Sequence, residues 1–172
     1  MKPFITVALS VLTLSLASGP SVRAKEQGKA DADTEFLTKV VPGIAASIKI
    51  IEYEVKNTSD DKVKNFAERV LKQHKESVKT ASEHAKRLKV AVVTDAEKDS
   101  KEVIDKLSKL KGADLDAAFL KWLSEIHENT TVFDNEVKNG TDAELKTYAK
   151  NSIAAGNEHL KEARDLLAKL KK

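Results

Sequence analysis

The chain has 172 residues, with 30 Lys and Arg against 27 Asp and Glu, and no Cys. This length indicates one domain. The near balance of charge argues against a dedicated nucleic-acid-binding protein, which needs a clustered excess of basic residues. The lack of Cys excludes disulfides, thiolate metal sites and Cys nucleophiles. Six Gly, three Pro and few aromatic residues are typical of an all-helical protein.

Residues 1–24 have the pattern of a secretory signal peptide. Lys2 precedes an apolar stretch over residues 4–17, and Val22-Arg23-Ala24 offers a cleavage site. The stretch is shorter than the roughly 20 residues that span a bilayer, and an uncleaved N-terminal anchor is the alternative. We predict export to the periplasm or the medium, cleavage near Ala24, and no transmembrane span in the mature chain. Lys2 and Arg23 are the charged residues that cleavage removes, which leaves a net charge of +1.

The rest of the chain reads as a short leader followed by helices. Residues 25–33 are polar and small, and we expect a flexible leader there and a helical domain over residues 34–172. From residue 34 onward, apolar residues recur at the helical period. The pattern predicts four long helices and one short one, over residues 34–57, 60–88, 95–110 (the short helix), 114–138 and 142–172.

Turn and cap signals punctuate these helices. Pro42 predicts a break or kink near Val41 in the first one. The segments Thr94–Glu97 and Thr141–Glu144 each match a capping box with Thr as the N-cap. Together the elements predict an all-α fold, an antiparallel four-helix bundle with the short helix in the connection between the second and third long helices. An elongated coiled coil is the alternative.

Several short motifs keep a definite order and spacing along the chain. They are Ser59-Asp60 before Val63-Lys64-Asn65-Phe66-Ala67, then Gln73-His74, Ile126-His127 and Glu158-His159-Leu160. From Phe36 to Leu170 the chain resembles an exported bacterial family described as domain of unknown function 4142. The resemblance implies a ferritin-like helical bundle and export, and it implies no activity. The family often has acidic residues where this chain has Ser47 and Gln73, so two carboxylates are missing from any polar site.

Three of the four His lie near the midpoints of three different predicted long helices: His74, His127 and His159. Midpoints of antiparallel helices share one level, and each His lies on or beside an apolar stripe, so we expect the imidazoles to be able to meet. Such a cluster suits Zn²⁺ or Cu²⁺, or a polar pocket for a ligand. The alternative is three buried, hydrogen-bonded His that set the helix register. We expect the fourth, His84, at the surface.

A di-iron oxidase is disfavoured. A ferritin-like di-iron centre needs Glu on two helices and a Glu-x-x-His pair on each of the other two. The residues three positions before the clustered His are Leu71, Ser124 and Gly156, and none is a carboxylate. We expect Gly156 to permit close helix packing instead.

Two hypotheses for function follow. The first is a non-enzymatic exported module of the cell envelope, for interaction or stress, without a cofactor and with an envelope protein as a possible partner. The second is a metal- or small-ligand-binding bundle that uses His74, His127 and His159. No catalytic triad context and no phosphate-binding loop is present in the sequence, and neither hypothesis involves nucleic acid.

Overall fold

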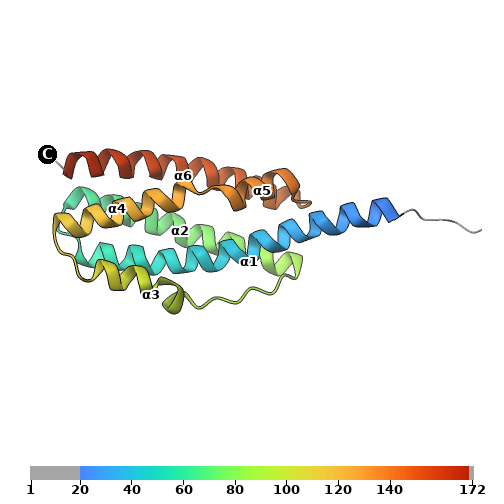
Figure 1. Cartoon of the computed structure of the whole chain (residues 1–172), viewed down its shortest axis with the longest axis horizontal. Coiled ribbons are helices and arrows are strands. Elements are labelled where there is room, and N and C mark those ends of the chain that lie inside the picture. The colour runs from blue at the N-terminus through green and yellow to red at the C-terminus, as the bar shows by residue number, and fades with distance from the viewer. Residues whose placement is uncertain (1–19, 171–172) are drawn as a thin grey trace, which may run out of the picture.

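The computed structural model describes residues 20–170, with side chains from Ala32 onward. Over this range the chain has six helices and no strand, and the helices pack as an all-α bundle (Figure 1). They are α1 (Pro20–Asn57), α2 (Asp61–Leu88), α3 (Ala96–Leu107), α4 (Ala113–Glu128), α5 (Thr131–Asn139) and α6 (Ala143–Leu170). The prediction of an all-helical protein is confirmed. Residues 1–19, most of the predicted signal peptide, lie outside the described residues.

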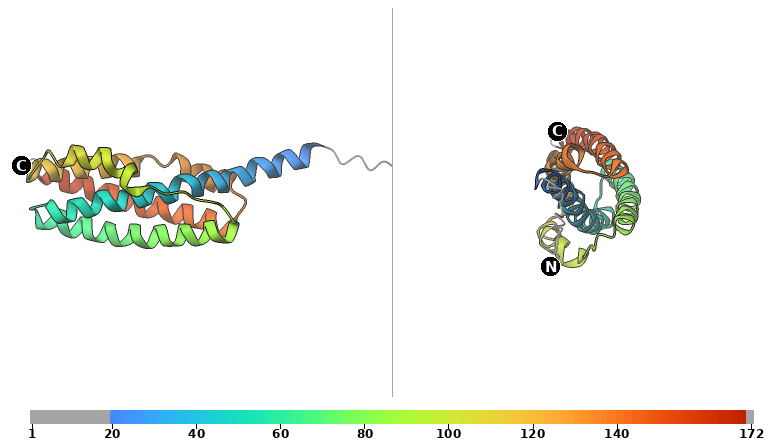
Figure 2. Two further views of the ribbon diagram at one scale, coloured as in Figure 1. Left: turned by 90° about the horizontal axis from the view of Figure 1, so that it is seen from below. Right: turned by 90° about the vertical axis from the view of Figure 1, so that its right-hand side faces the viewer.

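The long helices form two pairs. α1 packs against α2, and α4 packs against α6. α5 continues along the same edge of the bundle as α4 and contacts both α1 and α6 (Figures 1 and 2). α3 lies outside against α1, within the connection that returns the chain from the end of α2 to the start of α4 (Figure 1). Within the described residues, no helix is apolar over enough of its length to cross a membrane.

A small apolar cluster of Ile50, Leu107 and Leu115 packs α3 against α1 and α4. Two larger, separate apolar clusters fill the interior of the bundle. One contains Ile51, Phe66 and Leu123, and the other contains Phe36, Ala81 and Leu145. Along α2, α4 and α6, the residues between the two clusters include the three His singled out above. The interior of the bundle is therefore apolar at both ends and polar at the level between them, where α2, α4 and α6 each contribute one His.

The first helix differs from the prediction. α1 begins at Pro20 rather than at Thr34, so the stretch expected to be a flexible leader, residues 25–33, is helical, and Asp33 is buried. Of the break or kink expected near Val41, the break is wrong, because α1 runs through Pro42. A proline removes one helical hydrogen bond, and the buried neighbours Val40 and Val41 hold the backbone in place. The N-terminal part of α1 projects beyond the bundle (Figures 1 and 2).

The fourth predicted helix, residues 114–138, is wrong as a single element. The chain leaves helical geometry at Asn129, whose ψ is 86°, and α5 starts at Thr131. Local side-chain bonds favour the break: Thr130 Oγ1 donates to Asp134 Oδ2 at 2.6 Å, and Asn129 Oδ1 accepts from the backbone of Thr131 at 3.4 Å. Asn and Thr side chains compete with helical hydrogen bonds in this way, so the Asn-Thr-Thr run was a usable signal.

Both predicted capping boxes start helices, but the capping residue is the Asp that follows each Thr. Asp95 accepts from the backbone N–H of Lys98 at 3.2 Å, and Asp142 accepts from that of Leu145 at 2.8 Å. Thr141 is used elsewhere, since its backbone N–H and its hydroxyl both donate to the Asp33 carboxylate. A contact between distant segments thus displaced the local cap.

Candidate metal centre

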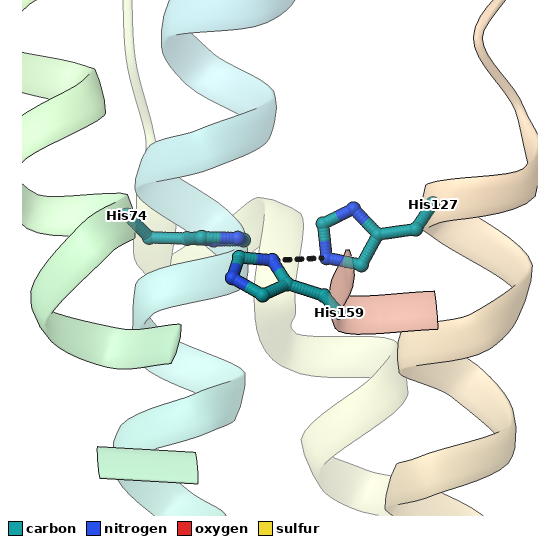
Figure 3. Close-up of side chains that lie close together, drawn as sticks. All are labelled: His74, His127 and His159. Carbon is teal, nitrogen blue, oxygen red and sulfur yellow. Dashed lines mark hydrogen bonds between the residues drawn. The ribbon is translucent and has the colours of Figure 1, made fainter. Parts of the chain in front are cut away.

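The structure brings His74, His127 and His159 together from α2, α4 and α6 (Figure 3). Their ring centroids are 4.9 Å apart for His127 and His159, 5.6 Å for His74 and His127, and 5.9 Å for His74 and His159. Each ring offers one nitrogen, and these three atoms all lie within 4.8 Å of one another. The three nitrogens are therefore close enough to share one metal ion after small side-chain movements.

His74 is oriented by a serine on the neighbouring helix α1. The Ser47 hydroxyl lies 2.8 Å from His74 Nδ1 and also donates to the backbone carbonyl of Ile44 at 2.8 Å. Because the single hydroxyl proton is used on Ile44, the Ser47 oxygen accepts from His74 Nδ1–H. The proton on Nδ1 leaves the lone pair on Nε2, the other nitrogen of the ring.

His159 is oriented by Gln73, the residue before His74 on α2. Gln73 Oε1 contacts His159 Nε2. A carbonyl oxygen only accepts, so Nε2 carries the proton and the lone pair of His159 lies on Nδ1. This Nδ1 atom faces His127 Nε2 at 3.3 Å (Figure 3). Two neutral hydrogen bonds thus turn two lone pairs toward the centre of the cluster.

The distance between His127 Nε2 and His159 Nδ1 matches a shared metal ion. Two nitrogens that each bind Zn²⁺ at about 2.0–2.1 Å lie about 3.3–3.4 Å apart in a tetrahedral site. The observed 3.3 Å equals this spacing and is long for a direct hydrogen bond. Closing the third nitrogen onto the same ion needs only a small side-chain movement, because it already lies within 4.8 Å of the other two.

The environment keeps all three imidazoles neutral at pH 7. Burial and, to a smaller extent, repulsion from His159 together lower the pKa of His74 to about 4. Burial lowers the pKa of His127 to about 3, again with repulsion from the other two rings. Burial also lowers the pKa of His159, although Glu158 and Glu162 oppose it. A neutral imidazole is the form that binds a metal ion, so binding needs no proton release at neutral pH.

Gly156 on α6 lets α4 approach this level of the bundle. A Cβ atom at this position would lie 3.1 Å from His127 Nδ1, closer than an ordinary contact. The expectation that Gly156 permits close helix packing is therefore confirmed, and the group that approaches is one of the three imidazoles.

A cavity of about 760 Å³ adjoins the cluster, and all three His line it. Its walls come mainly from α2 and α6. They include the hydroxyl groups of Ser77, Tyr148 and Ser152 and the apolar side chains of Ile126 and Phe133. The described lining contains no Lys and no Arg. The cluster is thus buried on one side and faces a chamber on the other.

A second group of potential ligands, His84, Asp142 and Glu144, lies near the surface. Arg87 occupies it, with bonds of 2.6 and 2.7 Å to Asp142 and a contact of 3.3 Å to Glu144. This guanidinium holds the pKa of Asp142 at about 2. Because the carboxylates already have a cationic partner, this group does not favour a metal ion. His84, expected at the surface, is half-buried against Tyr148.

Sequence reasoning missed two buried pairs of acids. Glu54 and Asp116 are 0% and 1% exposed, and Glu136 is fully buried beside Asp33. Both oxygens of Glu54 and of Glu136 lack a hydrogen-bond partner among the described residues when all acids are taken as ionised. A usable signal was present in the apolar stripes, since Glu54 follows Ile51 by three positions and Glu136 follows Phe133 by three.

Sequence reasoning also read Ser47 and Gln73 only as missing carboxylates. The structure places both against the imidazoles, as neutral acceptors that orient His74 and His159. The cluster therefore contains three His and two neutral polar partners, and no carboxylate joins the group of potential ligands within the described residues.

Comparison with known proteins identifies a family and no individual relative. Residues 18–166 match the family model described as Domain of unknown function (DUF4142). Neither the curated proteins nor the solved structures contain a match to the chain. Because the matched region covers most of the sequence, the chain belongs to the family Domain of unknown function (DUF4142).

Proposed function

We propose that this protein binds one Zn²⁺ or Cu²⁺ ion through His74, His127 and His159. The observation that carries the proposal is the convergence of three ring nitrogens from three helices within 4.8 Å of one another. If the three buried His only fixed the helix register, their ring nitrogens would not need to converge on one point. Here, by contrast, the partners Ser47 and Gln73 direct two lone pairs inward.

The ligand set favours Zn²⁺ or Cu²⁺ over iron in a di-iron centre. Imidazole nitrogen suits Zn, Cu, Ni and Fe, whereas ferritin-like di-iron centres need bridging carboxylates. The two buried acid pairs cannot serve this cluster as ligands, since the group of potential ligands around the imidazoles contains only the three His. The proposed activity is therefore binding of a single ion, without oxidation of ferrous iron.

A ferritin-like bundle is the architecture that we propose for this site. Two helix pairs, α1 with α2 and α4–α5 with α6, are joined by one long connection that carries α3. One long crossover is the connectivity of ferritin-like bundles, which build their metal sites from side chains on facing helices. The level of the three His between two apolar clusters is where such a site is expected.

We also propose that the protein works outside the cytoplasm, after removal of residues 1–24. The support is the signal-peptide pattern of the sequence. Cleavage near Ala24 leaves every described side chain, from Ala32 onward, in place. N-terminal sequencing of the protein from the periplasm or medium tests this, with an N-terminus near Lys25 expected. An intact Met1 in the cytoplasm would contradict it.

The metal proposal is tested on the purified protein with Zn²⁺ and with Cu²⁺. Elemental analysis after removal of excess metal is expected to give one ion per chain for the wild type and none for the variant His74→Ala/His127→Ala/His159→Ala. Saturating metal at about 100 times the Kd adds about 2.7 kcal/mol to the free energy of unfolding. For a domain of this size, the Tm rises by roughly 5–10 °C.

His84→Ala is the matched control, because His84 is the remaining His and lies outside the cluster. It is expected to bind metal as the wild type does. A wild type that stays metal-free under replete conditions would refute the proposal and leave the non-enzymatic envelope module as the remaining hypothesis. So would equal metal binding by the triple variant, because the ions would then be held elsewhere.

A further inference from the structure

We infer that the bound ion keeps one coordination position open toward the cavity and takes there a singly charged anionic donor, such as a carboxylate, on a small molecule with an apolar body. This inference rests on the proposed metal site and names the class of ligand that the site accepts. It follows from the number of protein ligands, the charge at the cluster and the lining of the cavity.

The protein supplies three ligands and leaves the fourth position to another molecule. Zn²⁺ is four-coordinate in proteins, and sites with three protein ligands hold water or substrate in the fourth position. Among the described residues, no Asp, Glu or further His joins the three His in the group of potential ligands. All three His line the cavity, so a fourth donor reaches the ion from the cavity side.

Charge favours an anionic donor. Imidazole binds a metal ion in its neutral form, and the partners Ser47 and Gln73 are neutral side chains, so the ion keeps both of its positive charges at the cavity wall. A buried charge of this kind is stabilised by a partner of opposite sign.

Charge also limits the donor to a single negative charge. The described lining has no Lys or Arg that would hold a second charge, and it includes the acids Glu76 and Glu144. A phosphate or a polycarboxylate therefore places its additional charges where nothing compensates them, whereas a monocarboxylate places its one charge on the ion.

The cavity accommodates more than the donor group. Its volume of about 760 Å³ lies in the range of sites for drug-sized molecules, which are mostly apolar with a few polar groups. Ile126 and Phe133 provide apolar contacts, while Ser77 and Tyr148, whose hydroxyl oxygens are 2.7 Å apart, provide a polar edge. An aromatic or aliphatic carboxylate matches this combination, because its body gains apolar contact that a bare anion lacks.

The test uses the protein loaded with Co²⁺, whose visible absorption reports the coordination of the ion. Azide, acetate, benzoate, inorganic phosphate and benzyl alcohol are the probes. Azide and benzoate are expected to change the spectrum saturably. Benzoate is expected to bind at least about tenfold more tightly than acetate, since burial of its ring contributes more than the 1.4 kcal/mol that a factor of ten requires. Phosphate is expected to bind no more tightly than acetate, and benzyl alcohol is expected to leave the spectrum unchanged.

A variant of the cavity wall separates contact with the cavity from binding to the metal. Ser152 lies on α6, two turns before His159, and lines the cavity. Ser152→Phe is expected to lower benzoate affinity at least tenfold while azide affinity and Co²⁺ content stay unchanged. Lys150→Phe, at an exposed α6 position outside the lining, is the matched control and is expected to behave as the wild type.

Failure of this inference is distinct from failure of the metal site. If one Co²⁺ binds per chain but azide and benzoate at about 100 mM leave its spectrum unchanged, the open position does not exist and the metal site stands. If phosphate binds more tightly than benzoate, the charge selection is wrong. If none of Co²⁺, Zn²⁺ and Cu²⁺ binds, the proposed function itself has failed.

Discussion

Glu54 on α1 and Asp116 on α4 face each other in the bundle interior. The variant Glu54→Gln tests how this buried pair changes the free energy of unfolding with pH. Burial and, to a smaller extent, the neighbouring Asp116 together raise the pKa of Glu54 to about 8. Asp116 lies in the first turn of α4, where the helix dipole favours a negative charge. We therefore assign the shared proton to Glu54, which donates it to Asp116.

The sign of the effect on stability follows from proton binding. Between pH 4.5 and pH 8 the folded state holds a proton on Glu54 that the unfolded state releases, so stability falls as the pH rises through this range. Each pH unit corresponds to about 1.4 kcal/mol, and the loss between pH 4.5 and pH 7 is about 3 kcal/mol. A Gln is neutral at every pH and still donates to Asp116.

The expected result is a difference in slope. The free energy of unfolding of Glu54→Gln relative to the wild type is expected to increase by about 3 kcal/mol from pH 4.5 to pH 7, measured by urea unfolding with circular dichroism. Glu68→Gln, at an exposed position of α2, is the control and is expected to keep the wild-type slope. Parallel pH profiles for the wild type and Glu54→Gln would refute the assignment of a buried shared proton.

Three further predictions concern the cluster and the core. Gly156→Ala is expected to weaken metal binding about tenfold, because a Cβ at 3.1 Å displaces His127 by more than the roughly 0.2 Å that metal geometry tolerates. The same change is expected not to lower the free energy of unfolding, since Ala is better than Gly inside a helix by about 1 kcal/mol. Calorimetry of metal binding and thermal unfolding measure the two effects separately. An unchanged metal affinity would count against the close contact between Gly156 and His127. Gln73→Leu is expected to weaken metal binding by roughly 10- to 100-fold, because His159 loses the acceptor that orients its ring. Gln73→Glu keeps an acceptor and is expected to bind metal at least as tightly as the wild type. Equal metal affinities of the two variants would exclude an orienting role for Gln73. Phe119→Ala changes a fully buried position outside the His cluster. It is expected to lower the free energy of unfolding by about 3–5 kcal/mol while the metal stoichiometry stays at the wild-type value. A loss below about 1 kcal/mol would show that the core is not packed as described.

The helices were the part of the structure that the sequence predicted best. α2 agrees with the prediction within one residue at its start and in full at its end, because its apolar residues recur regularly and Asp60 caps it. The helix ends were predicted wrongly where a single side chain makes a hydrogen bond that the apolar pattern does not indicate. Asn129 ends α4 ten residues before the predicted end of that helix, and Thr141 leaves its capping role to bind Asp33.

The candidate site was predicted in part. His74 and His159 lie near mid-helix as predicted, whereas His127, also predicted at mid-helix, lies in the last turn of α4 because the chain leaves helical geometry at Asn129. The three His still meet at one level, because α4 and α5 together follow the path predicted for one helix. The partners of the rings were not predicted. Which residue orients His159 depends on how α2 and α6 are rotated about their own axes, and this rotation is set by packing rather than by sequence spacing.

By itself, the sequence determined the helical class, the approximate bounds of several helices, and a nearly neutral chain after the proposed cleavage. These properties depend on periodicity and composition, which act within one helix at a time. Only the tertiary structure decided that Ser47 and Gln73 turn the imidazoles inward, that a cavity lies beside them, and that Glu54 is buried against Asp116. Each of these depends on the mutual rotation and depth of two or more helices, which the apolar faces settle only when they pack together.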